Sequence, residues 1–294
     1  MKKLADKIRR VGLIGNSEKV SCASVVKAAA GLVRGARREI FCDEATARLA
    51  KLEATIAADA ATLAREVDLL LVFGGDGTML RVAREIAGSA TPMLGINIGG
   101  LGFLTAVPSD DLARALKLVW RGEFKFERRA LIEATAQCGA REIRRTALND
   151  IVISRGVISR LIELDVDVDG DPLTRYRCDG LIISSPTGST AYSLAAGSAV
   201  VFPTADVFAL TPISPHTLSN RSLILPLNSV IHIKAISPKP ATILSADGEV
   251  VNELAAGEIV TVRRSRRTVR LMHLAESSFF EALRRKLHWR GANV

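Results

Sequence analysis

The sequence predicts an α/β N-terminal domain with a parallel sheet, followed by a β-rich, mainly antiparallel C-terminal domain. The 294 residues suffice for two domains of about 150 residues each. Helix-like and strand-like segments alternate up to about residue 104, and period-2 alternation of apolar and polar residues dominates afterwards. We expect domains at residues 1–104 and 105–275, with a helical tail at 276–294 that packs back on the N-terminal domain.

The N-terminal domain is predicted from short apolar strands that alternate with longer segments rich in helix-forming residues. Residues 68–73 are typical of a strand buried on both faces, because this segment is short, almost continuously apolar and followed by Gly74-Gly75. In chain order, the expected elements are a strand at 11–15, helices at 24–38 and 45–64, a strand at 68–73, a helix at 78–86 and a strand at 92–97. This order indicates parallel strands with crossover helices.

The C-terminal domain is predicted from alternating strands and hairpin turns. Residues 162–169 alternate without a break and lead into Asp169-Gly170, a dipeptide that favours a two-residue hairpin turn. Asp247-Gly248 repeats this signal. The other expected elements are a helix at 110–119, strands at 230–236, 242–246, 259–262 and 269–272, and a tail helix that begins with the capping-box spacing Ser278-Phe-Phe-Glu281.

The composition is that of a folded chain, with 48% hydrophobic and 24% charged residues, and it excludes a disordered or collagen-like protein. No apolar run approaches the roughly 18 residues of a membrane span. Charged residues soon follow Met1-Lys2-Lys3 where a signal peptide would be apolar, so we expect a cytoplasmic protein without a membrane partner. The four cysteines form no CxxC pair and are interpreted as reduced thiols.

The net charge of +9 favours an anionic partner, which could be nucleic acid, an acidic membrane surface or a phosphorylated small molecule. The basic clusters at 263–267 and 284–286 contain no aromatic residue on which a base could stack. A solvated basic face is therefore the favoured interpretation of these clusters, and we expect no nucleic-acid partner.

The strongest local signal is the segment Phe73-Gly-Gly-Asp-Gly-Thr78 at the carboxyl end of a predicted strand. Open α/β sheets bind ligands at this edge, and glycines let a phosphate or sugar approach the backbone. Asp76 is unusual there because a carboxylate repels phosphate, which indicates a proton acceptor or a metal-bound carboxylate. The alternative is an ordinary glycine turn in which Asp76 caps the next helix; Thr78 is also placed to cap it. The chain has neither a Rossmann fingerprint nor a Walker loop.

Three further segments are candidates for a ligand site. A second glycine loop at 95–102 either lines the same cleft or joins the domains. Asn149-Asp150 suits a nucleobase edge or ribose hydroxyls, although the dipeptide is also an ordinary turn. The segment 179–193 is more specific, because a carboxylate precedes an apolar strand that leads into Pro-Thr-Gly and a cluster of hydroxyl groups. We expect it to bind a polar ligand, with Thr190 capping a short helix at 191–196; the alternative is a serine-rich surface turn.

Two patterns favour other chemistries less well. Asp165-x-Asp167-x-Asp169-Gly170 matches the start of a calcium loop, but Tyr176 occupies the position of the bidentate glutamate, so we interpret it as the solvated face of a strand. The four histidines show no metal-ligand spacing, and only His216 lies in a polar loop. A hydrolase triad built on Ser189 or Ser193 lacks the GxSxG motif.

Taken together, these segments resemble the NAD kinase (ATP-NAD kinase) family of bacterial type. The resemblance runs from about residue 68 to the end of the chain. The matching segments are Phe73–Thr78, Gly95–Gly99, Leu101–Leu104, Leu148–Asp150, Asp179–Ile182, Pro186–Ser193, Pro215–Ser219 and Asp247-Gly248. The GGDGT sequence alone is shared with lipid kinases and phosphofructokinases, so the later segments make the resemblance specific.

The resemblance implies a Rossmann-like α/β domain, a β-rich domain and a substrate between them. It implies transfer of the γ-phosphate of ATP to the 2′-hydroxyl of the adenosine ribose of NAD, which gives NADP. Asp76 would be the general base, Gly77 would contact the substrate beside it, and Arg81 would lie near the phosphates. The other residues implied to bind NAD are Asn149 and Asp150 at the adenosine, Thr190, Ala191, Tyr192, Ser193, Leu194 and Ala195 along the dinucleotide, Asp179 at the nicotinamide end, and Arg160 and Arg177 as basic contacts.

His216 and Glu249 are further candidate contacts. Glu249 stands where many bacterial relatives carry glutamine, and Asp150 stands where glutamate is commoner. The resemblance also implies a divalent cation, usually Mg²⁺, that enters with ATP, and a homodimer or homotetramer. It identifies no protein ligand of the metal. By the same resemblance, Arg177 favours the oxidised cofactor.

Two alternatives remain beside an NAD kinase. A lipid or sphingoid-base kinase would share GGDGT, but the hydroxyl-rich segment 186–193 and the lack of an apolar docking stretch argue against it. A nucleotide-binding regulator would need no carboxylate at position 76. Phosphoryl transfer depends on positioning and charge neutralisation, which the glycine loops and a basic chain with a metal can supply.

Overall fold

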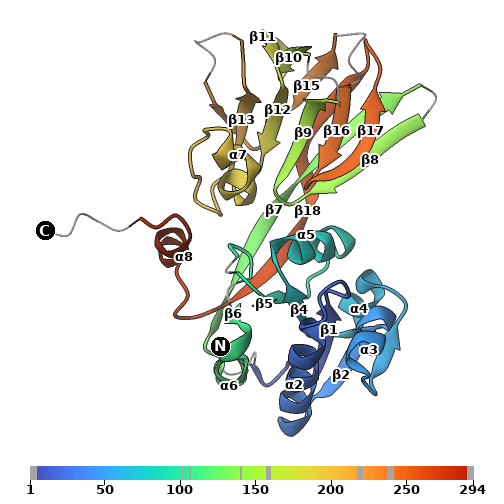
Figure 1. Cartoon of the computed structure of the whole chain (residues 1–294), viewed down its shortest axis with the longest axis vertical. Coiled ribbons are helices and arrows are strands. Elements are labelled where there is room, and N and C mark those ends of the chain that lie inside the picture. Colours follow the sequence, from blue (N-terminus) through green and yellow to red (C-terminus); the bar gives the residue numbers. More distant parts are fainter. Residues whose placement is uncertain are drawn as a thin grey trace, which may run out of the picture. The chain divides into compact units, whose positions relative to one another are not determined.

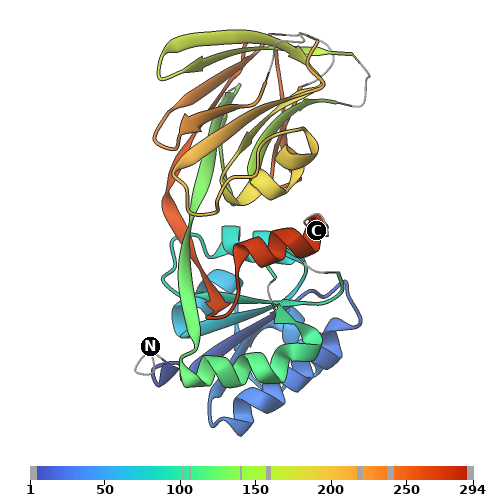
Figure 2. The same cartoon turned by 90° about the vertical axis from the view of Figure 1, so that its left-hand side faces the viewer.

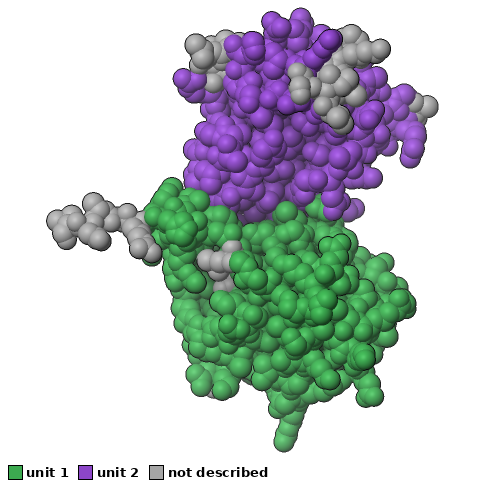
Figure 3. All heavy atoms as spheres, in the orientation of Figure 1, with its two compact units in different colours: residues 1–128, 269–294 green, residues 129–268 purple. Residues whose placement is uncertain are grey.

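The computed structural model describes residues 5–100, 102–105, 107–139, 141–156, 160–216, 221–236 and 242–289. The chain forms two compact units (Figure 3). Unit 1 consists of residues 1–128 and 269–294, and unit 2 of residues 129–268. The boundaries between the units thus lie within two long strands, β7 (Phe124–Cys138) and β18 (Ile259–Leu274). The sequence pattern changes earlier, near residue 104, from alternating helix-like and strand-like segments to period-2 alternation. The expected tail, from residue 276, belongs to unit 1.

Unit 1 contains the predicted parallel sheet. Its strands follow the order β5-β4-β1-β2-β3, and each neighbouring pair is parallel. The strands are β1 (Arg10–Gly15), β2 (Glu39–Asp43), β3 (Thr55–Ala57), β4 (Leu69–Gly74), β5 (Met93–Asn97) and the short β6 (Val107–Pro108). Every residue of β4 is buried, as expected for a central strand covered on both faces.

Helices cover both faces of this sheet (Figure 1). The helices described in unit 1 are α2 (Cys22–Gly35), α3 (Glu44–Ala50), α4 (Ala60–Glu66), α5 (Asp76–Glu85), η1 (Ser109–Asp111), α6 (Leu112–Arg121) and α8 (Phe279–Lys286). Leu71 on β4 shares a core with Val26 of α2 and Leu116 of α6; α2 and α6 lie side by side in Figure 2. On the other face, a Cβ at Gly12 would lie 3.2 Å from Leu63 of α4.

The prediction of one helix at 45–64 is wrong. The segment forms α3, then β3, then α4, and two aspartates mark the starts of the helices. Asp43 accepts a hydrogen bond from the backbone N–H of Thr46 at 2.8 Å, and Asp59 accepts one from Thr62 at 2.6 Å. Lys51, with a φ of 48°, ends α3 in the left-handed conformation. The alanine-rich composition hid this break because alanine favours a helix without fixing its ends.

Unit 2 consists of antiparallel strands from two sheets around one core. One sheet has the order β14-β13-β12-β9-β16-β17, and β11-β10-β15-β18, with β7 and β8, form the other within this unit. The strands are β8 (Arg141–Ala147), β9 (Asp150–Arg155), β10 (Ile162–Val168), β11 (Asp171–Cys178), β12 (Gly180–Ser184), β13 (Val207–Ile213), β14 (Leu223–Pro226), β15 (Ile231–Ala235), β16 (Thr242–Ala246) and β17 (Glu249–Leu254). Ile183 of β12 and Leu164 of β10 are both in the core.

Both predicted hairpin turns are confirmed. Asp169 and Gly170 have φ of 55° and 90° between β10 and β11, and Asp247 and Gly248 have φ of 49° and 80° between β16 and β17. Positive φ at both central residues is the requirement of a type I′ turn. Asp165, the first residue of the calcium-loop pattern, lies on β10 and forms an ion pair with Arg175 on β11 at 2.6 Å. The strands predicted at 259–262 and 269–272 are parts of one strand, β18.

The C-terminal helix begins where the sequence predicts, with Ser278 at its N-cap, but the Ser278 side chain makes no capping hydrogen bond. The four cysteines are free thiols, and burial raises the pKa of Cys178 to about 12. Of the helices that the structure describes, none combines the length and apolar character that a membrane crossing requires.

Candidate active site

Loops that follow β1, β4 and β5 meet at one edge of the sheet in unit 1. β4 ends at Gly74, Gly75 is the N-cap of α5 and Asp76 is its first residue. A side chain at Gly74 has no room, since its Cβ would lie 2.3 Å from the hydroxyl of Thr78. The prediction that Thr78 caps α5 is wrong. Thr78 is buried, and its hydroxyl accepts a hydrogen bond from Asn16 Nδ2 at 3.3 Å.

The carboxylate of Asp76 binds the loop that follows β5. Its Oδ2 accepts a hydrogen bond from the backbone N–H of Phe103 at 2.8 Å. Its Oδ1 accepts three, from the N–H of Leu104 at 3.1 Å and from the N–H and hydroxyl of Thr105, both at 3.3 Å. Asp76 therefore joins the two glycine loops instead of capping its own helix. Leu101 lies outside the described residues.

Gly102 makes this close approach possible, because a Cβ there would lie only 2.0 Å from Asp76 Oδ1. Asn97 supports the same loop, and its Nδ2 donates to the carbonyl of Gly100 at 2.8 Å and to the hydroxyl of Thr105 at 2.9 Å. Lys19 donates from Nζ to the carbonyl of Ile98 at 2.9 Å. Asn16 and Lys19 were not predicted as site residues, and Asn97 lies in a predicted ligand loop without having been predicted as a site residue itself. For Asn16 and Lys19 the available signal was their place directly after the first predicted strand.

The two remaining candidates in unit 1 are on α5. A Cβ at Gly77 would have no atom within 4 Å, so this residue borders open space. Arg81 forms hydrogen bonds with both carboxylate oxygens of Glu85, at 3.0 and 3.1 Å, and its side chain is 41% exposed. Arg81 is thus a half-exposed cation one turn after Asp76.

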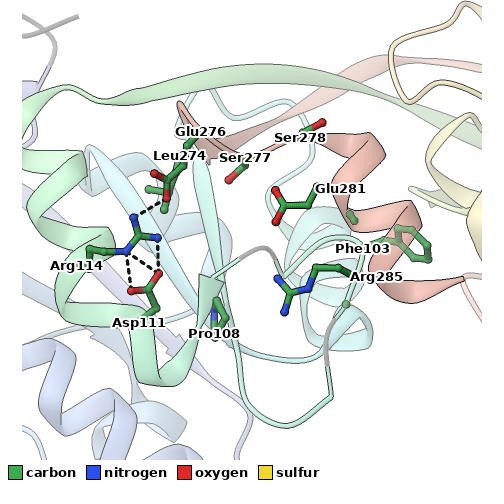
Figure 4. A pocket seen from close by; sticks show the side chains of 12 residues that line it. Phe103, Pro108, Asp111, Arg114, Leu274, Glu276, Ser277, Ser278, Glu281 and Arg285 are labelled. Carbon is green, nitrogen blue, oxygen red and sulfur yellow. Dashed lines mark hydrogen bonds and ion pairs between the residues drawn. The ribbon is translucent and has the colours of Figure 1, made fainter. Parts of the chain in front are cut away.

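We call residues 74–78 and 102–105 together the Asp76 loop, since Asp76 binds residues 103–105. A pocket of about 300 Å³ in unit 1 adjoins this loop (Figure 4). Gly102 and Phe103 form part of its wall, and most of the rest comes from residues 274–285, which include Glu281, Ala282 and Arg285 of α8. Arg114 is held there by Asp111 at 2.7 Å and by Glu276 at 2.6 Å. Lys286 of α8 lies 5.4 Å from the ring centre of Phe103. The C-terminal helix is thereby in contact with the loop that Asp76 holds.

In unit 2, a second aspartate holds residues 148–150, which we call the Asn149 turn. The carboxylate of Asp247, in the β16–β17 hairpin turn, accepts hydrogen bonds from the backbone N–H groups of Leu148, Asn149 and Asp150 at 3.0, 2.7 and 3.3 Å. The N–H of Asp247 donates to the carbonyl of Asp150 at 3.0 Å. The sequence analysis quoted Asp247 as part of a motif but did not include it among the site residues.

Asp150 is 4% exposed at the start of β9. Burial, together with the negative charge of Asp247, raises the pKa of Asp150 to about 7. This carboxyl group therefore changes charge near neutral pH, and it does so beside a second carboxylate. A group in such surroundings is a candidate for a functional role.

The segment that follows β12 packs against the Asn149 turn. It forms η2 (Thr187–Thr190) and α7 (Tyr192–Ala195). A Cβ at Gly188 would lie 2.2 Å from the carbonyl oxygen of Asn149, so only glycine fits. The prediction that Thr190 caps a helix is wrong. Ala191 is the N-cap of α7, and the Thr190 hydroxyl donates to the carbonyl of Thr187 at 3.3 Å.

The candidate dinucleotide residues of this segment differ in exposure. Ser193 is buried and lies 3.4 Å from the hydroxyl of Thr211, and Ser189 is buried with its hydroxyl bonded to the backbone of Pro186 and Val201. These bonds leave neither serine as a free nucleophile, which argues against a hydrolase. Tyr192 and Ala195 are exposed, and Thr190, Ala191 and Leu194 are half-buried.

A second group of candidates lies at the other end of the β9–β12 strand pair. Asp179 forms an ion pair with Arg155 at 2.7 Å, a partner that the sequence analysis missed. The backbone of Arg177 accepts a hydrogen bond from the N–H of His216 at 2.9 Å, and its guanidinium pairs with Glu163 at 3.1 Å. The register pairs Ser184 with Asp150 and Gly180 with Ser154. The two groups are thus separated by four residue steps of about 3.3 Å, or roughly 13 Å.

The remaining candidates are Arg160, Glu249 and His216, and all three are exposed. Glu249 lies at the start of β17. Residues 217–219 of the matching segment that contains His216 lie outside the described residues. Among the residues that the structure describes, no three His, Cys, Asp or Glu side chains gather in the manner of a metal site.

The fold and the Asp76 loop together indicate a class of protein. A parallel α/β unit with an aspartate in a GGDGT loop, joined to an antiparallel β unit, is the arrangement of a kinase without a Walker loop. Residues 12–124 match the family model for the ATP-NAD kinase N-terminal domain, and residues 148–274 match that for the ATP-NAD kinase C-terminal domain. The chain therefore belongs to the ATP-NAD kinase family.

Individual relatives agree with this assignment. The chain is 38% identical to the NAD kinase of Syntrophotalea carbinolica over 283 residues, which covers 96% of the chain and 99% of that protein. It is 39% identical to the NAD kinase of Polaromonas naphthalenivorans over 97% of the chain and 98% of that protein. Among solved structures, yeast NADH kinase complexed with NADH superposes with a TM-score of 0.86 at 26% identity, over 98% of this chain and 89% of that one.

Proposed function

We propose that this chain transfers the γ-phosphate of ATP to the 2′-hydroxyl of the adenosine ribose of NAD and so forms NADP. The observation that carries the proposal is the match of both ATP-NAD kinase domains to the chain, at 12–124 and 148–274. The Asp76 loop supports it, since an acidic side chain lies there at the ligand-binding edge of the parallel sheet.

We assign the role of general base to Asp76, and specifically to its Oδ2. Oδ1 already accepts three hydrogen bonds, whereas Oδ2 accepts one, from Phe103. A carboxylate oxygen has two lone-pair directions, so Oδ2 keeps one for the ribose hydroxyl. The bonds to residues 103–105 fix the carboxylate, and a fixed acceptor orients the nucleophile for in-line attack.

Charge on the transferred phosphate must be neutralised. We propose that Lys19 and Arg81 contribute to this, because Lys19 lies against the loop that Asp76 holds and Arg81 follows Asp76 by one helical turn. A Mg²⁺ ion bound to ATP would supply the rest by neutralising phosphate oxygens. Mg²⁺ commonly needs only one or two protein carboxylates besides phosphates and water. Because the free lone pair of Asp76 Oδ2 is assigned to the ribose hydroxyl, this ion would be held chiefly by the phosphates of the nucleotide with which it arrives.

For NAD we propose binding by unit 2. Asn149 and Asp150 would hold the adenosine ribose, residues 190–195 would line the dinucleotide, and Asp179 would bind the nicotinamide end. The separation of roughly 13 Å between the two groups suits an extended ligand with one nucleoside at each end of the β9–β12 pair. The name of the yeast relative, an NADH kinase complexed with NADH, supports a dinucleotide ligand.

Further contacts and the assembly are also proposals. Gly77, with open space beside it, would let the substrate approach the Asp76 loop. Arg160, Arg177, His216 and Glu249 would provide peripheral contacts to NAD. We propose a cytoplasmic homodimer or homotetramer that uses Mg²⁺ with ATP, in line with the resemblance to bacterial NAD kinases.

The test is NADP formation by purified protein supplied with NAD, ATP and Mg²⁺, beside an Asp76→Asn variant. Loss of a general base lowers a rate by about 10²–10⁴-fold, so we expect kcat to fall within that range with little change in KM for NAD. Asp110→Asn is the matched control, because Asp110 is exposed and, among the residues that the structure describes, its carboxylate accepts a hydrogen bond from the neighbouring Ser109 alone.

Thermal unfolding of both variants would separate catalysis from folding, since Asp76 also holds a loop. Full activity in a folded Asp76→Asn protein would remove Asp76 from proton transfer while leaving the kinase in place. Absence of NADP from folded wild-type protein would overturn the proposed function itself.

A further inference from the structure

The strongest unassigned feature is a pocket in unit 2 with five arginines among its eight lining residues. It has a volume of about 480 Å³ and lies where β7, β8 and β18 meet. Its lining residues are Glu133, Arg144, Thr146, Arg263, Arg264, Ser265, Arg266 and Arg267. None of them is among the residues that we propose to bind NAD.

The pocket carries a large excess of positive charge. Five of its lining residues are arginines, and Glu133 is the one acidic residue among them. Glu133 is 14% exposed and pairs with Arg263 at 2.9 Å and with Arg144 at 3.9 Å. Arg144 also pairs with Glu142, outside the pocket, at 3.4 Å. Arg264 pairs with Asp206, an exposed residue outside the pocket, at 3.3 Å. Arg266 and Arg267 have no side-chain partner in the part of the chain that the structure describes.

Such a concentration of like charge is unfavourable unless an anion binds. Guanidinium groups match phosphate oxygens in pairs of parallel hydrogen bonds, which makes arginine the common residue of phosphate sites. Ser265 and Thr146 add hydroxyl groups beside the arginines. Arg266 and Arg267, with Arg144 and Arg263 in the same lining, provide more guanidinium groups than a single phosphate requires, and they suit a ligand with several negative charges in a row.

The lining residues also restrict the class of ligand. They include no aromatic and no large apolar side chain. A nucleobase would therefore have no ring to stack on, and a lipid chain no apolar surface to cover. The lining residues therefore suit the phosphate groups of a ligand and no base or lipid chain.

We propose that this arginine pocket binds an oligophosphate of two or three phosphates, at a site separate from the NAD and ATP that react. The phosphates are free or form the end of a nucleotide whose base stays in solvent. This inference goes beyond the proposed kinase activity and does not depend on it.

The test is a calorimetric titration of the whole protein with inorganic tripolyphosphate in low salt. We compare wild type with an Arg266→Gln/Arg267→Gln variant and with an Arg9→Gln/Arg37→Gln control. The control loses the same charge from two exposed arginines of unit 1. We expect wild type and control to bind equally, and the pocket variant to bind at least tenfold more weakly. An Arg266→Lys/Arg267→Lys variant should keep part of the affinity, since it retains the charge without the paired hydrogen bonds.

Several results decide the proposal. A supporting result is that ATP binds the pocket as tightly as tripolyphosphate and loses the same affinity in the pocket variant, whereas adenosine does not bind. This result would show that the pocket recognises phosphate alone. Equal affinity in all three proteins would overturn the proposal, since tripolyphosphate would then bind elsewhere. A raised KM for ATP in the pocket variant, with tripolyphosphate competitive against ATP, would also overturn it by making the pocket part of the donor site. Preference for a single-stranded RNA or an acidic peptide over tripolyphosphate would assign a macromolecular partner instead.

Discussion

The Asp76 loop of unit 1 and the Asn149 turn of unit 2 are built in the same way. In each, an aspartate carboxylate accepts hydrogen bonds from three successive backbone N–H groups, and a glycine allows a close approach. They differ in what the glycine meets. Gly102 meets the Asp76 side chain, whereas Gly188 meets the backbone of Asn149. The first contact can adjust by rotation of a side chain, and the second can adjust only by moving the chain.

The largest effect is expected at Gly188. In Gly188→Ala, the new Cβ would lie 2.2 Å from a backbone oxygen that cannot rotate away. Overpacking typically costs about 1–3 kcal/mol and more where relief is blocked. We expect the free energy of unfolding to fall by about 3 kcal/mol in urea denaturation. Gly31→Ala is the control, because its Cβ would meet nothing within 4 Å; equal stability of the two variants would contradict the prediction.

Gly102→Ala should affect catalysis more than folding. The new Cβ would displace the Asp76 carboxylate, whose Oδ1 lies 2.0 Å from its position. Misplacement of a catalytic group by about 1 Å costs roughly 100-fold in rate, so we expect kcat for NADP formation to fall by about that factor. Gly100→Ala in the same loop, where a Cβ has no atom within 4 Å, should keep its kcat. If both variants lose activity equally, loop distortion and not Asp76 is responsible.

A smaller, pH-dependent effect on stability is expected at Asp150 in the Asn149 turn. The pKa of Asp150 is about 7 in the folded protein and near 4 when unfolded, so the folded state binds the extra proton between these values. Stability therefore decreases as pH rises through this window. Between pH 6 and 8 the loss from this group is about 1 kcal/mol. Asp150→Asn should abolish it, measured as the difference in unfolding free energy from wild type at each pH; a constant difference would refute the raised pKa.

The features that the sequence predicted are those that local chemistry decides. The Asp169-Gly170 and Asp247-Gly248 turns were predictable because positive φ at two adjacent residues almost requires these residue types. The buried strand at 68–73 was predictable because a central parallel strand is apolar throughout.

The features that escaped prediction depend on residues far apart in the chain. Asp76 was assigned to its own helix or to the substrate, yet its partners are 27 to 29 residues later, and nothing local to Asp76 marks them. The ion pair of Arg155 with Asp179 arises from the register of β9 on β12. Lys19 joins the site only because parallel strands bring their carboxyl ends to one edge.

The passage of β7 and β18 through both units has a consequence for biosynthesis. Unit 2 is a continuous stretch of chain, residues 129–268, and its contacts can form as soon as that stretch has left the ribosome. Unit 1 is interrupted: β5 gains its neighbour β18 through Leu271, which is synthesised long after the rest of the parallel sheet. The glycine loops next to β5 thus belong to the unit that is completed last, so a nascent chain carries a complete unit 2 before it carries a complete unit 1.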